Sequence, residues 1–240
     1  MIRQRVLQWF ESQKVGGLQW ALMSSAIKAL RLAHAPLGRQ RFARALSRAG
    51  DRANVSIGAG RARLPGWINT DIDRGAEAYL DLTKRWPLQG SGVWRIYGDN
   101  VIEHFDLAAG RIVLHNCYEA LAPGGRIRLV TPDVECTARG YLVGGPEFAA
   151  PHLKLLRSYG KVAEYPVDLL RVTFAEWGHW SGYCYDFSAL RTELERAGFV
   201  NVVRAESEQS GDSVFRNLES RAGSIETELQ LVVEADRPLR

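Results

Sequence analysis

The sequence is poor in cysteine, with three in 240 residues. Cys117, Cys136 and Cys184 lie far apart and form no CxxC pair, which argues against a zinc ribbon and against a disulfide scaffold. We expect each to be a small buried hydrophobic residue. This usage is typical of a reducing compartment, and we predict a cytoplasmic protein.

Long hydrophobic runs are also missing. The longest charge-free apolar stretch of the N-terminal region, Val15 to Ile27, has 13 residues and is interrupted by Gln19 and two serines. A membrane-spanning helix needs about 20 apolar residues, so this stretch is too short. Because no compact apolar region precedes a small-residue cleavage site, we expect no signal peptide.

Acidic residues are scarce at the N-terminus. Residues 1–52 carry ten basic and two acidic groups, a net charge of +8, whereas the other 188 residues carry 21 basic and 25 acidic groups, a net charge of −4. Apolar residues recur at spacings of three and four between the arginines, which predicts a basic amphipathic helical arm over residues 1–50. We expect the arm to pack on its own domain, to form a homodimer, or to lie on the inner face of a membrane. No nucleic-acid-binding module accompanies it, which argues against nucleic acid as a partner.

Alternating strands and helices follow and define a domain over residues 51–240. The expected strands are 53–57, 67–71, 79–82, 93–97, 126–132, 199–206 and 226–235, and the expected helices are 107–121 and 187–197. Asp186 and Gly198 suit the start and the end of the last helix. This alternation predicts an α/β fold with a mainly parallel sheet covered on both faces. Residues 133–185 are aromatic, and we expect them to be irregular.

The first crossover lacks a helix. Only about nine residues separate the strand that ends in "VSIGAG" from the strand "WINTD", whereas parallel strands normally need a dozen or more. Another element must cover the face that this helix would cover. We expect the third helix of the arm, about Arg39–Ala49, to do so.

Glycine and acidic residues gather at the ends of successive strands. The residues at or just after the expected strand ends are Gly58, Ala59, Gly60, Asp71, Asp73, Asp81, Asp99, Asn100, Glu103, His104, Thr131 and Asp133. In doubly wound sheets, ligands bind at these ends. Glycine lets a ligand approach the backbone, and a carboxylate can bind both ribose hydroxyls. The set therefore favours an adenosine-containing ligand, although GxG alone is weak evidence.

With these motifs in place, the chain resembles the class I S-adenosylmethionine-dependent methyltransferases. It is most similar to a group of predicted methyltransferases linked to surface polysaccharide synthesis, through the glycine turn, "LPGWINTD", "LDL", "VIEH" and "LAPGGRIRLVTPD". The resemblance covers most of residues 53–235 and excludes the arm. It implies a Rossmann-like, seven-stranded, mostly parallel sheet with an antiparallel last strand. It also implies O-methylation of a sugar or another small polar acceptor, with residues 133–185 as an acceptor-side insertion.

The resemblance further implies which residues hold S-adenosyl-L-methionine. These are Gly58, Ala59, Gly60, Arg61, Asp71, Ile72, Asp81, Leu82, Asp99 and Asn100. A full crossover helix would offer its N-terminal amides to the methionine carboxylate. Because that helix is reduced to "RARLPG", we predict that Arg61 or Arg63 takes over part of this contact. The alternative for both arginines is a solvated surface turn.

Methyl transfer to oxygen usually needs a base for the hydroxyl proton. The candidate bases are His179, His104, Glu103 and Asp133, and the candidate acceptor-binding aromatics are Trp177, Trp180 and Tyr183. Packing offers a simpler role for all of them: a histidine bonded in a loop, a capping pair, or an aromatic core. The strand-end acids are assigned to ribose and adenine, and the histidines are not clustered at ligand spacing, so we expect no metal site.

Two other functions are compatible with the fold. A non-catalytic methyltransferase-like scaffold subunit could use the arm to dock. An NAD-dependent enzyme is disfavoured, since the dinucleotide motif needs GxGxxG opening a full helix with an acid about twenty residues further on. Here Asp71 follows Gly60 by eleven residues.

Overall fold

The computed structural model describes residues 35–73, 75–87, 92–219 and 225–239. The first two helices expected in the arm, and with them the predicted membrane and subunit contacts, lie outside these residues. Within the described part of the chain, no helix has the length and apolarity needed to cross a membrane.

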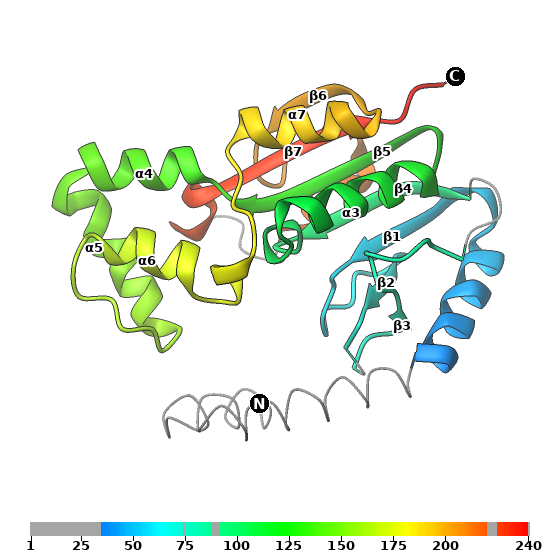
Figure 1. Cartoon of the computed structure of the whole chain (residues 1–240), viewed down its shortest axis with the longest axis horizontal. Helices are drawn as coiled ribbons and strands as arrows, with labels where there is room; N and C mark the ends of the chain where they lie inside the picture. Colours follow the sequence, from blue (N-terminus) through cyan, green and yellow to red (C-terminus); the bar gives the residue numbers. More distant parts are fainter. Residues whose placement is uncertain (1–34, 74, 88–91, 220–224, 240) are drawn as a thin grey trace.

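A seven-stranded sheet with the order β3-β2-β1-β4-β5-β7-β6 forms the centre of the molecule (Figure 1). The strands are β1 (Ala53–Ile57), β2 (Ile68–Asp71), β3 (Ala78–Tyr79), β4 (Val93–Asp99), β5 (Leu121–Pro132), β6 (Val200–Ala205) and β7 (Gln230–Asp236). Neighbours from β3 to β5 pair in parallel, and β7 runs antiparallel to both β5 and β6. The predicted Rossmann-like sheet with an antiparallel last strand is therefore confirmed.

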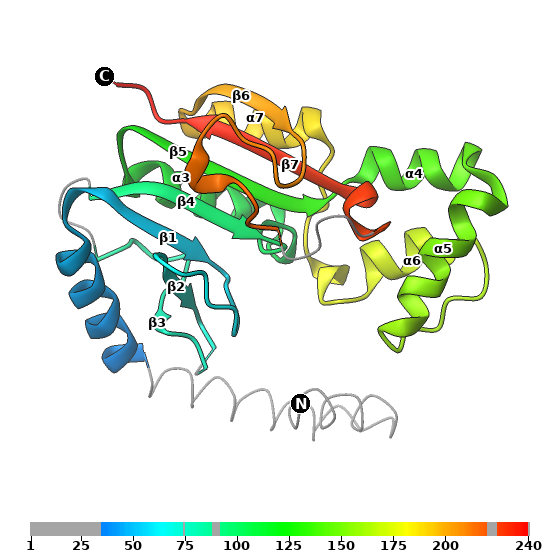
Figure 2. The ribbon, with the colours of Figure 1, turned by 180° about the vertical axis from the view of Figure 1, so that it is seen from behind.

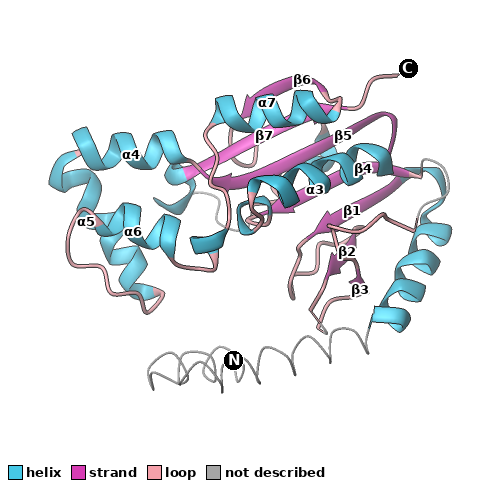
Figure 3. Ribbon diagram, in the orientation of Figure 1, coloured by secondary structure: helices cyan, strands magenta, loops and turns pink. Residues whose placement is uncertain are grey.

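Helices flank this sheet and extend beyond its end (Figure 3). They are a helix over residues 35–49, α3 (Leu107–Ala120), α4 (Val134–Val143), α5 (Gly145–Ser158), α6 (Asp168–Ala175) and α7 (Phe187–Ala197). Short 3-10 turns are η1 (Gly50–Arg52), η2 (Ile102–His104), η3 (His179–Ser181), η4 (Ser213–Phe215) and η5 (Ile225–Leu229). As predicted, the Asp186 side chain caps α7 by accepting the Ala189 N–H, and Gly198 ends it with a φ of 107°.

The 35–49 helix packs on the face opposite to the one predicted. Its fully buried Phe42 joins the main core with Val55 of β1, and its ring meets Trp86 edge-on. Helices α3 and α7 cover the same face. The β1–β2 and β4–β5 connections step in opposite directions across the sheet, so right-handed crossovers place them on opposite faces. The 35–49 helix shares the face of α3, which is the β4–β5 connection, and therefore does not cover the face of the β1–β2 connection.

The face that has no crossover helix is covered by irregular segments. Trp67 from the short crossover and Phe215 from η4 pack together there, with ring centroids 6.0 Å apart. Leu64 packs against the same cluster. Figure 2 shows the segment that carries η4 lying across this side of the sheet.

Residues 133–185 are mostly helical, which corrects the prediction of an irregular insertion. Helices α4, α5 and α6 form a group beyond the carboxyl ends of β4 and β5 (Figures 1 and 3), with a small core of Ala149, Leu153, Ala163 and Leu169. Pro151 lies inside α5, Gly144 separates α4 from α5, and Gly145 begins α5. These residues normally break helices and hid the helical period in the sequence.

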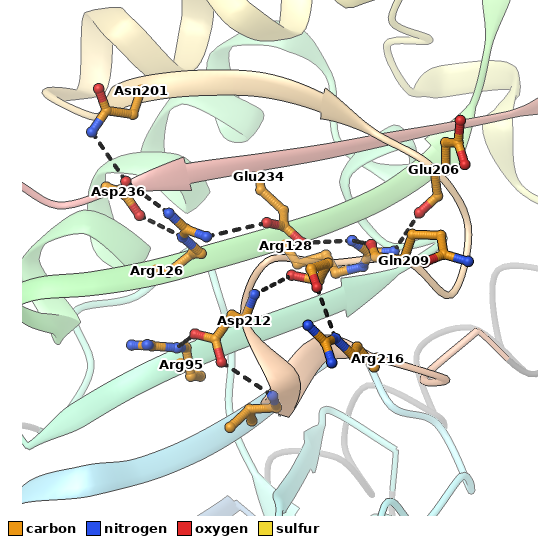
Figure 4. Close-up of polar contacts among 12 residues, drawn as sticks. Arg95, Arg126, Arg128, Asn201, Glu206, Gln209, Asp212, Arg216, Glu234 and Asp236 are labelled. Carbon is orange, nitrogen blue, oxygen red and sulfur yellow. Dashed lines mark hydrogen bonds and ion pairs between the residues drawn. The ribbon is translucent and has the colours of Figure 1, made fainter.

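A buried ion network joins β5 and β7 to the segment between β6 and η5. Figure 4 shows the part of it in which Arg128 contacts Glu234, Glu206 and Gln209. The fully buried Arg128 donates to Glu219 Oε1 at 2.7 Å and to Glu234 Oε1 at 2.6 Å. Its remaining donors reach the carbonyls of Glu206 and Gln209. Each charge of this buried group has an opposite charge beside it.

Candidate active site

The turn after β1 brings its backbone close to the end of β4. Gly58 and Gly60 have φ values of 61° and 56°. A Cβ atom on Gly58 would lie 2.3 Å from a methyl carbon of Val101, so only glycine fits there. A Cβ atom on Gly60 would meet no atom within 4 Å, so the turn leaves open space above its second glycine.

Asp71 ties the end of β2 to this turn without a crossover helix. Its Oδ2 accepts the Gly60 N–H at 2.9 Å, and its Oδ1 accepts the Asp73 N–H at 2.7 Å. A carboxylate offers about four acceptor positions. Each oxygen of the half-buried Asp71 therefore retains the capacity to accept a ligand hydroxyl.

The other residues predicted to bind the cofactor are divided between the strand ends and the core. Asp81 Oδ1 accepts both the N–H and the hydroxyl of Thr83, whereas the Leu82 side chain is buried in the main core. Asn100 has a φ of 49°, and its N–H donates to the Val130 carbonyl. Its buried Oδ1 accepts no hydrogen bond from the described residues. Ala59 lies in the glycine turn, while Ile72 and Asp99 are half-buried beside the ends of β2 and β4.

The two arginines of the short crossover differ in their contacts. Arg63 donates to the carbonyls of Ala62 and Gly75 and so holds the turn together. Arg61 extends along Gly75 with its Nε atom nearest to that residue. Of the two, Arg61 is the better candidate for a carboxylate contact.

A cavity of about 500 Å³ opens at the carboxyl ends of β4 and β5. Its lining residues are Asn100, His104, Pro132, His152, Leu155, Leu156, Tyr159, Leu169, Thr173, Trp177, His179, Leu229 and Gln230. Three buried polar atoms of this lining, Asn100 Oδ1, His152 Nε2 and Gln230 Oε1, make no hydrogen bond with the described residues. Buried polar atoms are normally satisfied, so this cavity is suited to a polar ligand.

Three of the predicted catalytic residues lie together beside this cavity. The His179 Nδ1 atom is 2.6 Å from the Thr173 carbonyl, which can only accept, so Nδ1 carries the proton. His179 Nε2 then presents its lone pair 3.8 Å from Oε1 of the fully buried Glu103. The His104 ring meets the His179 ring edge-on at 4.8 Å. Burial lowers the pKa of His179, which keeps its imidazole neutral near pH 7.

Asp133 is not part of the cavity lining. Its carboxylate caps α4 by accepting the Cys136 N–H, and it pairs with Arg204. Among the aromatic candidates, Trp177 lines the cavity, whereas Trp180, 74% exposed, and the partly exposed Tyr183 do not.

Sequence reasoning missed the cavity wall that α5 and α6 supply. A signal was present in the spacing of Ala149, His152, Leu153 and Leu156, which is that of one helix face. Pro151 concealed it.

Comparison with known proteins yields a likeness of fold. No protein-family model matches the sequence, and no curated protein matches it. An O-methyltransferase family protein from Burkholderia thailandensis is 14% identical, with a TM-score of 0.48 over 99% of this chain and 71% of that chain. The S-adenosylmethionine-dependent methyltransferase SibL is 17% identical, with a TM-score of 0.45 over 94% of this chain and 60% of that chain. The CurJ carbon methyltransferase is 18% identical, with a TM-score of 0.44 over 79% of this chain and 49% of that chain. The match spans about half of CurJ.

Proposed function

We propose that the protein is an S-adenosylmethionine-dependent methyltransferase that O-methylates a sugar or another small polar acceptor in polysaccharide synthesis. The observation that supports this most is the position of Asn100. It directly follows β4, beside the glycine turn, and it also lines the cavity. A cofactor on the turn and an acceptor in the cavity would thus meet at one residue.

The residues at the turn fit this cofactor. The open space above Gly60 admits a ligand to the backbone, and the two Asp71 oxygens retain acceptor positions for the ribose hydroxyls. Asp81 would face the adenine, and Arg61 the methionine carboxylate. When bound, the cofactor supplies a methyl group activated by a sulfonium.

The cavity fits a polar acceptor. Its unsatisfied polar atoms come from three different parts of the fold, the residue after β4, α5 and β7, so they can bind hydroxyl groups that point in different directions. Trp177 can stack on a sugar face. His179 is neutral, and its Nε2 lone pair lies on the side of the ring away from the Thr173 carbonyl. It is therefore the group suited to accept the hydroxyl proton.

Calorimetry with S-adenosylmethionine tests the cofactor half of the proposal. We expect wild-type protein to bind one equivalent and Asp71→Ala to bind at least tenfold more weakly. Asp73→Ala removes a neighbouring carboxylate of the same turn and serves as the matched control, with a change of less than threefold. No binding heat at millimolar cofactor would instead favour the scaffold function.

Labelled methyl transfer tests the acceptor half. The protein is incubated with cofactor labelled on the methyl group and with a panel of sugars, nucleotide sugars and glycans, and products are identified by mass spectrometry. We expect a mass gain of one methyl group on a hydroxyl oxygen. Transfer to carbon or nitrogen in every productive case would contradict the O-methylation proposal. The arm as a membrane or subunit contact remains a separate prediction.

A further inference from the structure

Glu103, His104 and His179 place three ligand atoms at one point of the cavity. The first two come from η2 and the third from η3, and one ligand atom from each lies within 4.8 Å of the others. The histidines are far apart in the sequence, which is why no metal site was expected. The fold joins them because η2 and η3 pack on each other: a Cβ atom on Gly178, next to His179, would lie 3.4 Å from His104 Nδ1.

The separation of these atoms suits an ion. His179 Nε2 and Glu103 Oε1 are 3.8 Å apart, which is longer than a hydrogen bond. Two donors that each lie about 2.1 Å from a shared metal ion are about 3.0–4.2 Å apart. A ring nitrogen of the exposed His104 lies within 4.8 Å of both atoms, so ligation would require the ring to turn toward them.

A second set of contacts orients the three side chains. His179 donates its other ring N–H to the Thr173 carbonyl at 2.6 Å, and the Thr131 hydroxyl donates to Glu103 Oε2 at 3.1 Å. The backbone of Gly178 packs against the His104 ring, since a Cβ atom on Gly178 would lie 3.4 Å from His104 Nδ1. Metal-binding histidines and carboxylates are typically held in this way, with one atom fixed from behind and the other presented to the ion.

A fourth candidate ligand atom, an amide oxygen, lies on the same cavity wall. Asn100 Oδ1 is buried and makes no hydrogen bond with the described residues, and Asn100, His104 and His179 all line the cavity. An amide oxygen is a suitable ligand for a divalent ion, and the cavity itself leaves a position for a ligand from solvent.

We propose that Glu103, His104 and His179 bind one divalent transition-metal ion, with Asn100 beside it and an open position facing the cavity. Two imidazoles and one carboxylate favour Mn²⁺, Fe²⁺, Co²⁺ or Zn²⁺ over Mg²⁺ and Ca²⁺, which prefer oxygen ligands. Metal binding does not depend on the proposed methyl transfer. Its use in catalysis does rest on that function. With the ion bound, His179 Nε2 would be a ligand and no longer a base, and the ion would lower the pKa of an acceptor hydroxyl at the open position.

Titration of the chelator-stripped full chain with MnCl₂, followed by electron paramagnetic resonance, tests the site. We expect one bound Mn²⁺ per chain, displaced by Zn²⁺ and not by equimolar Mg²⁺. Glu103→Gln keeps the size of the side chain and an oxygen for the Thr131 hydroxyl, and we expect it to weaken Mn²⁺ binding at least tenfold, as should His179→Ala. His152→Gln, a histidine of the same cavity outside the trio, is the matched control and should change binding less than threefold.

Two results would overturn the site: less than a tenth of an equivalent bound by wild-type protein, or equal binding by wild type and Glu103→Gln. Circular dichroism checks that the variants fold. If His179→Ala does not fold, the comparison of wild type with Glu103→Gln is sufficient for the test. Methyl transfer is measured separately, with and without chelator. Mn²⁺ binding without transfer would refute the proposed function only, and chelator-resistant transfer without Mn²⁺ binding would refute the metal site only.

Discussion

Two buried polar groups on this sheet differ in how completely they are satisfied. Around Arg128, the carboxylates of Glu219 and Glu234 accept from guanidinium groups. Backbone carbonyls accept from the other Arg128 donors (Figure 4). Around His179, one ring nitrogen contacts the Thr173 carbonyl, and the neighbouring Asn100, His152 and Gln230 retain polar atoms without a hydrogen bond to the described residues. Polar groups that are fully paired stabilise a fold, whereas buried groups that are left with capacity are suited to bind a ligand.

A second hollow of greater volume is a weaker candidate for the active site. About 700 Å³ lies at the opposite end of the strands, lined by Arg95, Arg126, Asp212 and Asp236. It is more open than the cavity at His179, and its arginines pair with its aspartates. The number of unsatisfied buried atoms therefore distinguishes the two hollows better than volume does.

The largest expected effect comes from breaking the satisfied group. We expect Arg128→Met to lower the free energy of unfolding by about 3–5 kcal/mol, because the Glu219 and Glu234 carboxylates would stay buried without their partner. Urea denaturation measures the change. Arg126→Met, on the same strand but with a side chain 29% exposed, is the control and should cost about 1 kcal/mol or less. Equal losses in the two variants would mean that burial does not set the energy of this network.

His179→Ala should show the opposite balance of stability and activity. We expect methyl transfer to fall at least about 100-fold, since proton removal by a positioned group typically contributes 10²–10⁴-fold. The loss of unfolding free energy should be only about 1–2 kcal/mol, from one hydrogen bond to Thr173 and a partly filled site. Initial transfer rates and urea denaturation are measured on the same preparation. More than about a tenth of wild-type activity would exclude His179 as the general base.

The sequence was sufficient to predict features that depend on local residues. β1 has the predicted bounds, and the Asp186 cap, the Gly198 end and the glycine turn of Gly58 and Gly60 are where their residue types require them. The positions of Asp71 and Asn100 near the glycine turn followed from the rule that the carboxyl ends of parallel strands share one edge of the sheet.

Features that depend on distant segments could not be predicted. The face of the sheet on which Phe42 packs is set relative to the crossovers, whose handedness involves distant strands. The contact between the His104 and His179 rings depends on the packing of η2 against η3. The helices around Pro151 are stabilised by their shared core, which overrides weak local propensity.

A smaller effect is expected at the crossover turn. Arg61→Ala should weaken S-adenosylmethionine binding by threefold or more, because a charge-assisted contact to the methionine carboxylate would be lost. Arg63→Ala is the comparison, since this guanidinium already bonds the carbonyls of Ala62 and Gly75. Calorimetry distinguishes the two. A loss of less than threefold in both variants would remove the crossover arginines from the cofactor site.

The smallest effect concerns a satisfied charge that supports the cavity wall. Two backbone N–H groups and Arg171 stabilise the Asp168 carboxylate at the start of α6, and they lower its pKa to about 2, the Tyr165 N–H contributing most. The stabilisation is therefore present above pH 4 and is lost as the pH falls through about 2.

Asp168→Asn should flatten the dependence of unfolding free energy on pH between about 4 and 2, measured by urea denaturation at each pH. Asp106→Asn, at the cap of α3, accepts one backbone N–H and is the matched control. Helix α6 also carries Thr173, whose carbonyl orients His179. A shift in the Mn²⁺ affinity of Asp168→Asn would therefore show that the hydrogen bonds of Asp168 at the start of α6 help to determine the geometry around His179. An unchanged affinity would show that η3 holds His179 without this support.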